Sequence, residues 1–306
     1  MKLARYEHAR ETWVGRVEGD NVVPLAPGEG HAGQDSLLRF AVAHNHGAGA
    51  PRPVRDPTPL ADVRLLTPVP APPSIRDFYA FEAHVATARR TRGLDMEPEW
   101  YEQPVFYFSN PGAVLGPDDS ATAPSGCIEL DYELEVAAVI GYPVRDCSPA
   151  DGLEAIAGFT VMNDWSARDV QRREMRVGLG PSKGKDFATS LGPFLVTPDE
   201  LPGFGDGRPR GAMTAFVNGA AWSSGELADI HFSWGDIVAH AARDATLRAG
   251  DVLGSGTVGT GCILELAAVH GGERYPWLLP GAVVELTVDG LGSLTNRVGE
   301  RREPPQ

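Results

Sequence analysis

Apolar and polar residues alternate along residues 128–135, which predicts a strand with two unlike faces. Glu129, Asp131, Glu133 and Glu135 share one face, and apolar side chains occupy the other. An antiparallel strand with one face in water produces the same alternation. Carboxylates spaced by two on a rigid strand also suit a hard divalent cation, which binds several carboxylate oxygens. The local pattern leaves both interpretations open.

Short apolar runs elsewhere predict many strands and few helices. Before residue 70 the strand signals are residues 12–17 and 21–25, followed by a loose stretch rich in His, Gly and Ala. Beyond residue 72 we expect strands at residues 104–108, 126–141, 158–163, 192–196, 213–217, 251–254, 262–269 and 282–288. Helical spacing predicts helices at residues 76–90, 149–156 and 234–243, with Asp77 as the N-cap of the first.

A proline-rich segment at residues 67–74 divides the chain. Its four closely spaced prolines favour an extended backbone. We therefore expect a small N-terminal β-rich domain over residues 1–71 and a larger domain over residues 72–306. Strands dominate without a regular alternation of strand and helix, which indicates an α+β, β-rich class with mixed or antiparallel sheets and peripheral helices.

Composition narrows the classes of partner. The formal net charge of −14 argues against nucleic acid and anionic membranes, since a phosphate backbone requires clustered Lys and Arg. No apolar stretch approaches the roughly 18 residues of a membrane span. The three cysteines, Cys127, Cys147 and Cys262, have no metal-ligand spacing and fit free thiols in a reducing compartment. We expect a cytoplasmic protein that acts on a small molecule.

Three further segments carry candidate chemistry. His84 follows Asp77 by two helical turns, although a single helical histidine is more often structural. Asp164 ends an apolar run, where it suits either a ligand role or an ordinary cap. Only three lysines occur in the chain, and Lys183 and Lys185 share one segment, which indicates either a required ammonium or a flexible surface loop.

Read together, four motifs resemble the fumarylacetoacetate hydrolase family and occur in its order. They are Asp131-Tyr-Glu-Leu-Glu135, residues 163–171 (Asn-Asp-Trp-Ser-Ala-Arg-Asp-Val-Gln), Lys183-Gly-Lys-Asp186 leading to Gly192-Pro193, and residues 249–257. The resemblance covers about residues 72–298. It implies a mixed β-sandwich roll, usually homodimeric, with one divalent cation per site and a small β-rich N-terminal domain in longer members.

The resemblance also implies a set of metal ligands. Three carboxylates are those that hold the cation throughout the family: Glu133, Glu135 and Asp164. Asp77 matches a fourth ligand found in fumarylacetoacetase, whereas no motif requires Glu129 or Asp131. The expected cation is Mg²⁺, and Mn²⁺ or Ca²⁺ would accept the same oxygen ligands.

Catalytic and substrate-binding roles follow from the same comparison. His84 matches the catalytic base, Glu265 on a late strand its partner, and Lys185 the cation that stabilises an oxyanion. Three residues match substrate contacts: Tyr79, Gln171 and Thr257. Short acylpyruvases place a Glu one turn after the His, where this chain has Thr87. The resemblance is therefore closer to fumarylacetoacetase in the pair and in the fourth carboxylate.

These residue types suit hydrolysis of a carbon–carbon bond in a β-diketo acid of the fumarylacetoacetate or acylpyruvate type. Such an acid chelates a divalent cation through its enolate oxygens, and a His held by a Glu can activate water. The alternative is a decarboxylase, isomerase or hydratase of a 2-oxo acid, resembling oxaloacetate or 2-hydroxyhepta-2,4-dienedioate, which needs no hydrolytic water. A third hypothesis is a metal-binding protein with an idle site.

Two features depart from these interpretations. Met175 stands where fumarylacetoacetase has a substrate-contacting Tyr, and Arg90 and Arg92 match its substrate-binding Arg only approximately. Residues 254–259 fit the Gly-x-Gly-x-x-Gly pattern of a dinucleotide site, but a strand at residues 262–269 would leave no helix to bind the phosphates. We also expect Arg168 and Asp169 to form a structural ion pair.

Overall fold

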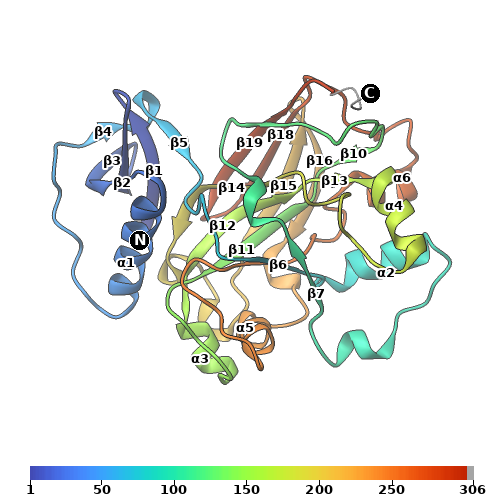
Figure 1. Cartoon of the computed structure of the whole chain (residues 1–306), viewed down its shortest axis with the longest axis horizontal. Coiled ribbons are helices and arrows are strands. Elements are labelled where there is room, and N and C mark those ends of the chain that lie inside the picture. The colour runs from blue at the N-terminus through green and yellow to red at the C-terminus, as the bar shows by residue number, and fades with distance from the viewer. Residues whose placement is uncertain (302–306) are drawn as a thin grey trace.

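Two β-sheets pack against each other and give the molecule its layers. The computed structural model describes residues 1–301 (Figure 1). Within these residues the large sheet contains twelve strands: β1 (Lys2–His8), β2 (Glu11–Glu18), β3 (Asn21–Pro27), β4 (Thr58–Pro59), β5 (Arg64–Leu66), β6 (Ile75–Phe78), β7 (Phe106–Ser109), β8 (Val114–Leu115), β11 (Leu134–Ile140), β12 (Ile156–Asp164), β14 (Thr189–Val196) and β17 (Val252–Gly254).

The remaining elements surround this sheet. The second sheet contains β9 (Ser120–Ala121), β15 (Ala212–Val217), β16 (Ala220–Glu226), β18 (Val283–Val288) and β19 (Gly292–Val298), and a separate short ladder joins β10 (Leu130–Asp131) to β13 (Ser166–Ala167). The α-helices are α1 (Gly30–Asn45), α2 (Glu82–Arg90), α3 (Pro149–Glu154), α4 (Arg168–Val177), α5 (Trp234–Ala242) and α6 (Ile263–His270). The α+β, β-rich class is confirmed.

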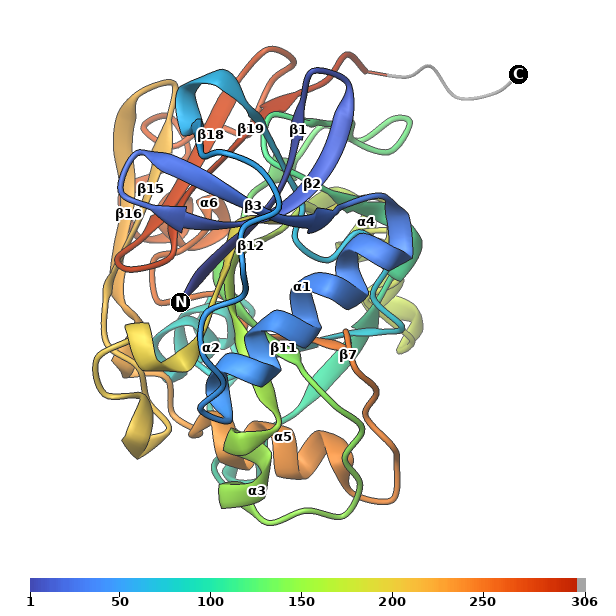
Figure 2. The ribbon, with the colours of Figure 1, turned by 90° about the vertical axis from the view of Figure 1, so that its left-hand side faces the viewer.

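Strands β11 and β12 form the centre of the core. Every residue of both strands is buried, because apolar layers cover both faces of the sheet. Helix α1 covers one face, where Leu37, Leu38 and Ala41 join the same apolar cluster as Val139 of β11 (Figure 2). The second sheet and α5 contribute to the cluster on the other face. Within residues 1–301 no helix is both long and apolar enough to cross a bilayer.

The N-terminal strands continue the large sheet. Strand β1 pairs antiparallel with β14, and Leu3 lies opposite Leu195. The expected loose stretch after residue 25 is wrong, since residues 30–45 form α1. The poor helix propensity of its Gly and His residues is outweighed by burial of an apolar face against the sheet. The domain boundary at residues 71 and 72 stays a prediction.

Two expected elements have a different type. The helix expected at residues 76–90 begins only at Glu82, and Asp77 lies on strand β6, whose four residues are all buried. The strand expected at residues 262–269 is helix α6. A short run that is apolar on all sides fits either type, and hydrogen bonds from outside the segment decide between them. In α6 the Asp131 carboxylate accepts the backbone N–H groups of Ile263 and Leu264.

Four neighbouring strands bring distant acidic residues together. The sheet order places β6, β17, β11 and β12 side by side, and Gly254 of β17 lies opposite Asp77 of β6. A Cβ atom at Gly254 would stand 2.4 Å from Asp77 Oδ1 and 2.9 Å from Met162 Cε. The missing side chain therefore leaves room for the Asp77 carboxylate beside the central strands.

We expect Gly254→Ala to lower the free energy of unfolding by about 1–3 kcal/mol, as overpacking of a tight core does. The added methyl group must displace the Asp77 carboxylate or Met162. Urea denaturation measures the change, and Gly49→Ala is the matched control, because nothing lies within 4 Å of a Cβ at Gly49. Equal effects of the two substitutions would show that Asp77 and Met162 do not need the space at Gly254.

Candidate active site

Four carboxylates from separate elements converge in the core. Asp77 lies on β6, Glu133 between β10 and β11, Glu135 on β11 and Asp164 at the end of β12. One carboxylate oxygen from each lies within 4.8 Å of those of the other three. None of the four residues is more than 5% exposed. These residues, named here the carboxylate cluster, concentrate negative charge where water cannot screen it.

The hydrogen bonds to the carboxylate cluster are unevenly distributed. Lys185 Nζ donates to both Glu133 and Asp164. Glu133 also accepts from Arg168 Nη2 at 2.7 Å, and Asp164 accepts from the Tyr107 hydroxyl at 2.6 Å. Glu135 has the Thr257 hydroxyl at 3.2 Å. Asp77 therefore lacks the cationic partners that Glu133 and Asp164 have.

Buried oxygens without a partner mark where positive charge is missing. Among residues 1–301, Asp77 Oδ1, Glu135 Oε2 and Asp164 Oδ1 have no hydrogen-bond partner. Burial and then the neighbouring Asp164 raise the pKa of Asp77 well above its usual value, and burial and then Asp77 do the same for Glu135. Burial also acts to raise the pKa of Glu133, but Lys185 and Arg168 hold it below its ordinary value.

A divalent cation fits this deficit. The donors are all oxygens, three of them unpaired, in the arrangement that hard cations such as Mg²⁺, Mn²⁺ and Ca²⁺ require. Unpaired buried carboxylates are otherwise costly, because each loses its hydration without compensation. Glu129 and Asp131 lie outside the carboxylate cluster, in keeping with the absence of either from the expected ligand set.

Arg168 connects the carboxylate cluster to a second buried acid. Its Nε donates to Asp131 at 2.8 Å, while its Nη2 donates to Glu133. The expected ion pair with Asp169 is wrong, because Asp169 accepts the backbone N–H of Ile128 instead. The short ladder between β10 and β13 pairs Leu130 with Ala167, so it carries Asp131 and Arg168 into contact across 37 residues of sequence.

Asp131 in turn positions the start of helix α6. Its two oxygens accept the backbone N–H groups of Ile263 at 2.7 Å and Leu264 at 3.0 Å. These groups have no partner within the helix, and the positive end of the helix dipole favours a carboxylate there. Glu265 is the next residue. No local pattern predicts this contact, since residues 131 and 263 lie far apart in the chain.

His84 and Glu265 form a close pair beside the carboxylate cluster. His84 Nδ1 lies 2.8 Å from Glu265 Oε2, and the two residues are 5% and 2% exposed. The contact is short, but its angle is not that of a straight hydrogen bond. The Tyr79 ring stands edge-on to the His84 ring, with centroids 5.3 Å apart, and burial raises the pKa of Tyr79 to about 12. Glu265 reaches this position from helix α6 rather than from the expected strand.

The two lysines of residues 183–186 have different environments. Lys185 is 4% exposed and contacts the carboxylate cluster, whereas Lys183 lies on the surface and pairs with Asp186 at 2.8 Å. Glu174 of α4 accepts the backbone N–H groups of Ser182 and Gly184, which fixes the loop. A buried ammonium and a surface lysine therefore occur within three residues.

The expected substrate contacts bind site residues. Gln171 Oε1 accepts from Arg168 Nη1 at 3.1 Å, and Thr257 donates to Glu135. Sequence reasoning missed Tyr107, which donates to Asp164, and gave Arg168 the wrong partner. The only available signal for Tyr107 was its place on an expected strand, which did not show that β7 pairs with β6.

The glycine-rich residues 254–259 do precede a helix, contrary to the expectation. The start of this helix is nonetheless unsuited to a dinucleotide. The amide groups at the start of α6 already bind Asp131, so they offer no open cradle for a phosphate. The position of Thr257 beside Glu135 relates these glycines to the carboxylate cluster.

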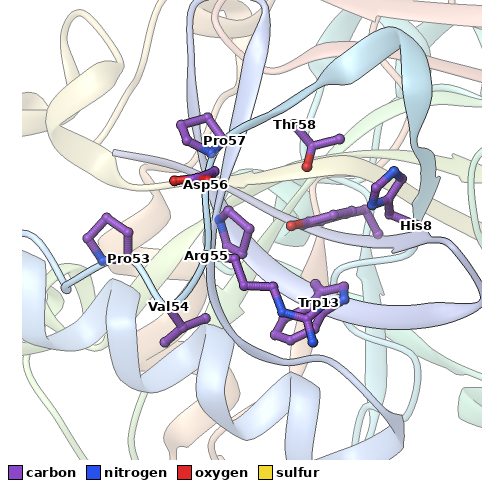
Figure 3. A pocket seen from close by; sticks show the side chains of 10 residues that line it. His8, Trp13, Pro53, Val54, Arg55, Asp56, Pro57 and Thr58 are labelled. Atoms are coloured by element: carbon purple, nitrogen blue, oxygen red, sulfur yellow. The ribbon is translucent and has the colours of Figure 1, made fainter.

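A separate hollow of about 720 Å³ lies on the N-terminal strands (Figure 3). The Arg55 guanidinium stacks on the Trp13 ring at 4.1 Å and binds Glu11 at 2.7 Å. None of the candidate site residues lines this hollow. We therefore do not assign the reaction to it.

Comparison with known families divides the chain into two matches. Residues 74–299 match the fumarylacetoacetate (FAA) hydrolase C-terminal family, and residues 1–68 match the Rv2993c-like N-terminal family. Protein Rv2993c of Mycobacterium tuberculosis is 29% identical over 294 residues, which cover 95% of this chain and 99% of that protein. Oxaloacetate tautomerase YisK of Bacillus subtilis is 28% identical over 78% of this chain and 74% of its own.

A protein of Burkholderia multivorans that is named a hydrolase is 32% identical over 195 residues. The match spans 62% of this chain and 64% of that protein. Solved structures match nearly the whole chain. Fumarylacetoacetate hydrolase of Exiguobacterium antarcticum gives a TM-score of 0.74 at 25% identity, and 5-carboxymethyl-2-hydroxymuconate delta-isomerase of Mycobacterium smegmatis gives 0.71 at 27%. Each match covers 98% of this chain and 100% of the other.

We expect Asp131→Asn to lower the free energy of unfolding by about 3–5 kcal/mol, since it leaves Arg168 without one of its buried partners. Glu129→Gln is the matched control on the same segment. Its pair with Arg172 is exposed on the arginine side and should be worth no more than about 1 kcal/mol. Urea denaturation compares the two, and a small effect of Asp131→Asn would refute the positioning role.

We expect Mg²⁺ or Mn²⁺ to bind the protein at one site and Glu135→Gln to weaken that binding at least 10-fold. The substitution removes an anionic ligand from the carboxylate cluster. Isothermal calorimetry measures the affinity, and Glu129→Gln should leave it unchanged. Equal affinities for wild type and Glu135→Gln would place the cation elsewhere.

Proposed function

The chain belongs to the fumarylacetoacetate hydrolase family, and we propose that it is a metal-dependent hydrolase of a carbon–carbon bond in a β-diketo acid of the fumarylacetoacetate or acylpyruvate type. One observation carries the proposal. The His84–Glu265 pair, a base with its orienting carboxylate, lies next to the carboxylate cluster. His84 is close enough to Glu133 to act on its pKa: burial acts to raise this pKa, whereas Lys185, Arg168 and His84 lower it. Hydrolysis requires such a base, whereas tautomerisation of a 2-oxo acid needs no activated water.

Asp77, Glu133, Glu135 and Asp164 would hold the cation, which we propose is Mg²⁺, with Mn²⁺ and Ca²⁺ as alternatives. When bound, a divalent cation supplies Lewis-acid charge that orients the two keto oxygens of the substrate and stabilises the enolate that leaves. The fourth carboxylate, Asp77, and the His84–Glu265 pair support closeness to fumarylacetoacetase within the family.

His84 is the proposed general base. The Glu265 carboxylate at Nδ1 favours the tautomer that carries its proton on that nitrogen, which leaves Nε2 to accept a proton from water. Both residues are buried, so the pair is held in place by packing. The Tyr79 ring packs edge-on against the imidazole, with ring centroids 5.3 Å apart, and Tyr79 is a proposed substrate contact.

Lys185 is the proposed oxyanion stabiliser. Burial acts to lower its pKa, but Asp164 and Glu133 raise the pKa above its usual value, so the side chain stays a cation. An ammonium group has three donors, and the two carboxylates account for two of them. The third can meet the alkoxide that forms when water adds to the acyl carbonyl. Gln171, fixed through its oxygen on Arg168, and Thr257 are the proposed substrate contacts.

The proposed reaction balances without a further reactant. The hydroxide generated by His84 bonds to the acyl carbon, and the bond from that carbon to the adjacent α-carbon breaks. The bonding pair passes to the α-carbon, which gives an enolate, and the His84 imidazolium returns the proton. The products are a carboxylic acid and either a 2-oxo acid, from an acylpyruvate, or acetoacetate, from fumarylacetoacetate. Homodimer formation and a cytoplasmic location remain predictions.

A tautomerase or isomerase on the same scaffold is the second candidate. Its support comes from the names of two relatives, the oxaloacetate tautomerase of Bacillus subtilis and the delta-isomerase of Mycobacterium smegmatis. These reactions need an enolate and a proton donor but no attack by water. A decarboxylase or hydratase of a 2-oxo acid would also need an enolate to be stabilised at the carboxylate cluster.

We expect the purified protein with Mg²⁺ to cleave at least one member of a panel of acylpyruvates and fumarylacetoacetate. Glu265→Gln should lower the cleavage rate by about 10²–10⁴, the usual contribution of a positioned acid–base group. Loss of the ultraviolet absorbance of the diketo acid measures the rate for every member of the panel, and Glu82→Gln, at an exposed position of α2, is the control.

Two results would count against hydrolysis. Cleavage by wild type no faster than by His84→Ala would rule out the proposed base. Turnover of oxaloacetate tautomers at the full rate in Glu265→Gln would favour the second candidate.

A further inference from the structure

A second group of metal-ligating side chains lies beside the carboxylate cluster. It consists of His84 on α2, Cys262 just before α6 and Glu265 in the first turn of α6. One ligand atom from each lies within 4.8 Å of those of the other two. The residues are 5%, 0% and 2% exposed, respectively. This group, named here the thiol cluster, contains nitrogen, sulfur and oxygen donors.

Both other members of the thiol cluster point at one oxygen of Glu265. Oε2 lies 2.8 Å from His84 Nδ1 and 3.7 Å from Cys262 Sγ. His84 Nδ1 makes no hydrogen bond of acceptable angle with any residue in the range 1–301, although it is buried. A buried imidazole nitrogen that lies against a carboxylate without a proper hydrogen bond, where a thiol contacts the same carboxylate oxygen, has the surroundings of a metal ligand.

We propose that His84, Cys262 and Glu265 form a second metal site, one that takes Zn²⁺ and is distinct from the carboxylate cluster. Zn²⁺ binds thiolate, imidazole and carboxylate with four-coordinate geometry, and sites with three protein ligands complete it with water. The carboxylate cluster, with oxygen donors alone, suits harder cations. The two clusters therefore select different metals by the softness of their donors.

The charge balance favours a dication at the thiol cluster. Coordination requires loss of the thiol proton, which passes to solvent, and Zn²⁺ with a thiolate and a carboxylate gives a neutral centre. Burial, followed by Asp131, raises the pKa of Cys262 well above its usual value when no cation is present. A coordinated cation reverses this, because it deprotonates the thiol it binds.

Occupation of the thiol cluster would switch off the proposed hydrolase. Zn²⁺ on His84 Nδ1 replaces the contact that orients the imidazole, and the base no longer has its carboxylate partner. This consequence rests on the proposed function, whereas binding of the metal itself does not. Zn²⁺ is thus the proposed inhibitor of a Mg²⁺-dependent reaction, and binding and inhibition are measured separately.

Cobalt(II) is the spectroscopic probe for the site. The intact protein is saturated with Mg²⁺ to occupy the carboxylate cluster and then titrated with Co²⁺. We expect one equivalent to produce the near-ultraviolet charge-transfer band of a cobalt thiolate. Cys262→Ser should abolish the band, and Cys127→Ser, at another buried cysteine, should retain it. No band in wild type, or a band that survives Cys262→Ser, overturns the proposal.

A second measurement does not depend on the folding of a variant. X-ray absorption of the wild-type protein with one equivalent of Zn²⁺ should show one sulfur neighbour at about 2.3 Å. A zinc environment with only oxygen and nitrogen neighbours overturns the site. If Zn²⁺ acquires its sulfur ligand and cleavage continues undiminished, the metal site stands and the role of the His84–Glu265 pair as catalytic base fails.

Discussion

The crowding of four buried carboxylates determines how the rest of the active site is arranged. Asp77, Glu133, Glu135 and Asp164 place their oxygens within 4.8 Å of one another, where burial removes the hydration that would offset their repulsion. Lys185 and Arg168 compensate Glu133 and part of Asp164, and unpaired oxygens remain. Uncompensated negative charge on oxygen donors is what a site for a divalent metal presents.

Arg168 makes the site a single connected structure. It holds Glu133 of the carboxylate cluster with one nitrogen and Asp131 with another, and Asp131 binds the first backbone amides of α6. Glu265 on that helix then meets His84 on α2. Hydrogen bonds between buried partners therefore join the proposed metal site to α6, and the close contact of Glu265 with His84 joins α6 to the proposed base, so that side chains from separate elements are held in one geometry.

The central sheet supplies the rigidity that this arrangement requires. Three of the four carboxylates lie on adjacent or nearly adjacent strands whose backbones are fixed by ladder hydrogen bonds, and Gly254 leaves the space that Asp77 occupies. Strands β11 and β12 are buried on both faces, so the acids at their ends cannot move to water without unpacking the core. The N-terminal unit adds α1 to one face and stands apart from the chemistry.

The sequence alone determined the class of fold, about half of the strands and a resemblance that brought together the residues of both clusters except Cys262. It could do so because the alternation within a strand and the residues within a motif each belong to one short stretch of the chain. Only the tertiary structure decided that Asp77 lies on a strand, that Glu265 lies on a helix, that Arg168 binds Asp131 and that Tyr107 binds Asp164. Each of these depends on strand pairing or a buried contact between residues far apart in the chain, and a short apolar run does not reveal which partner will satisfy its polar groups.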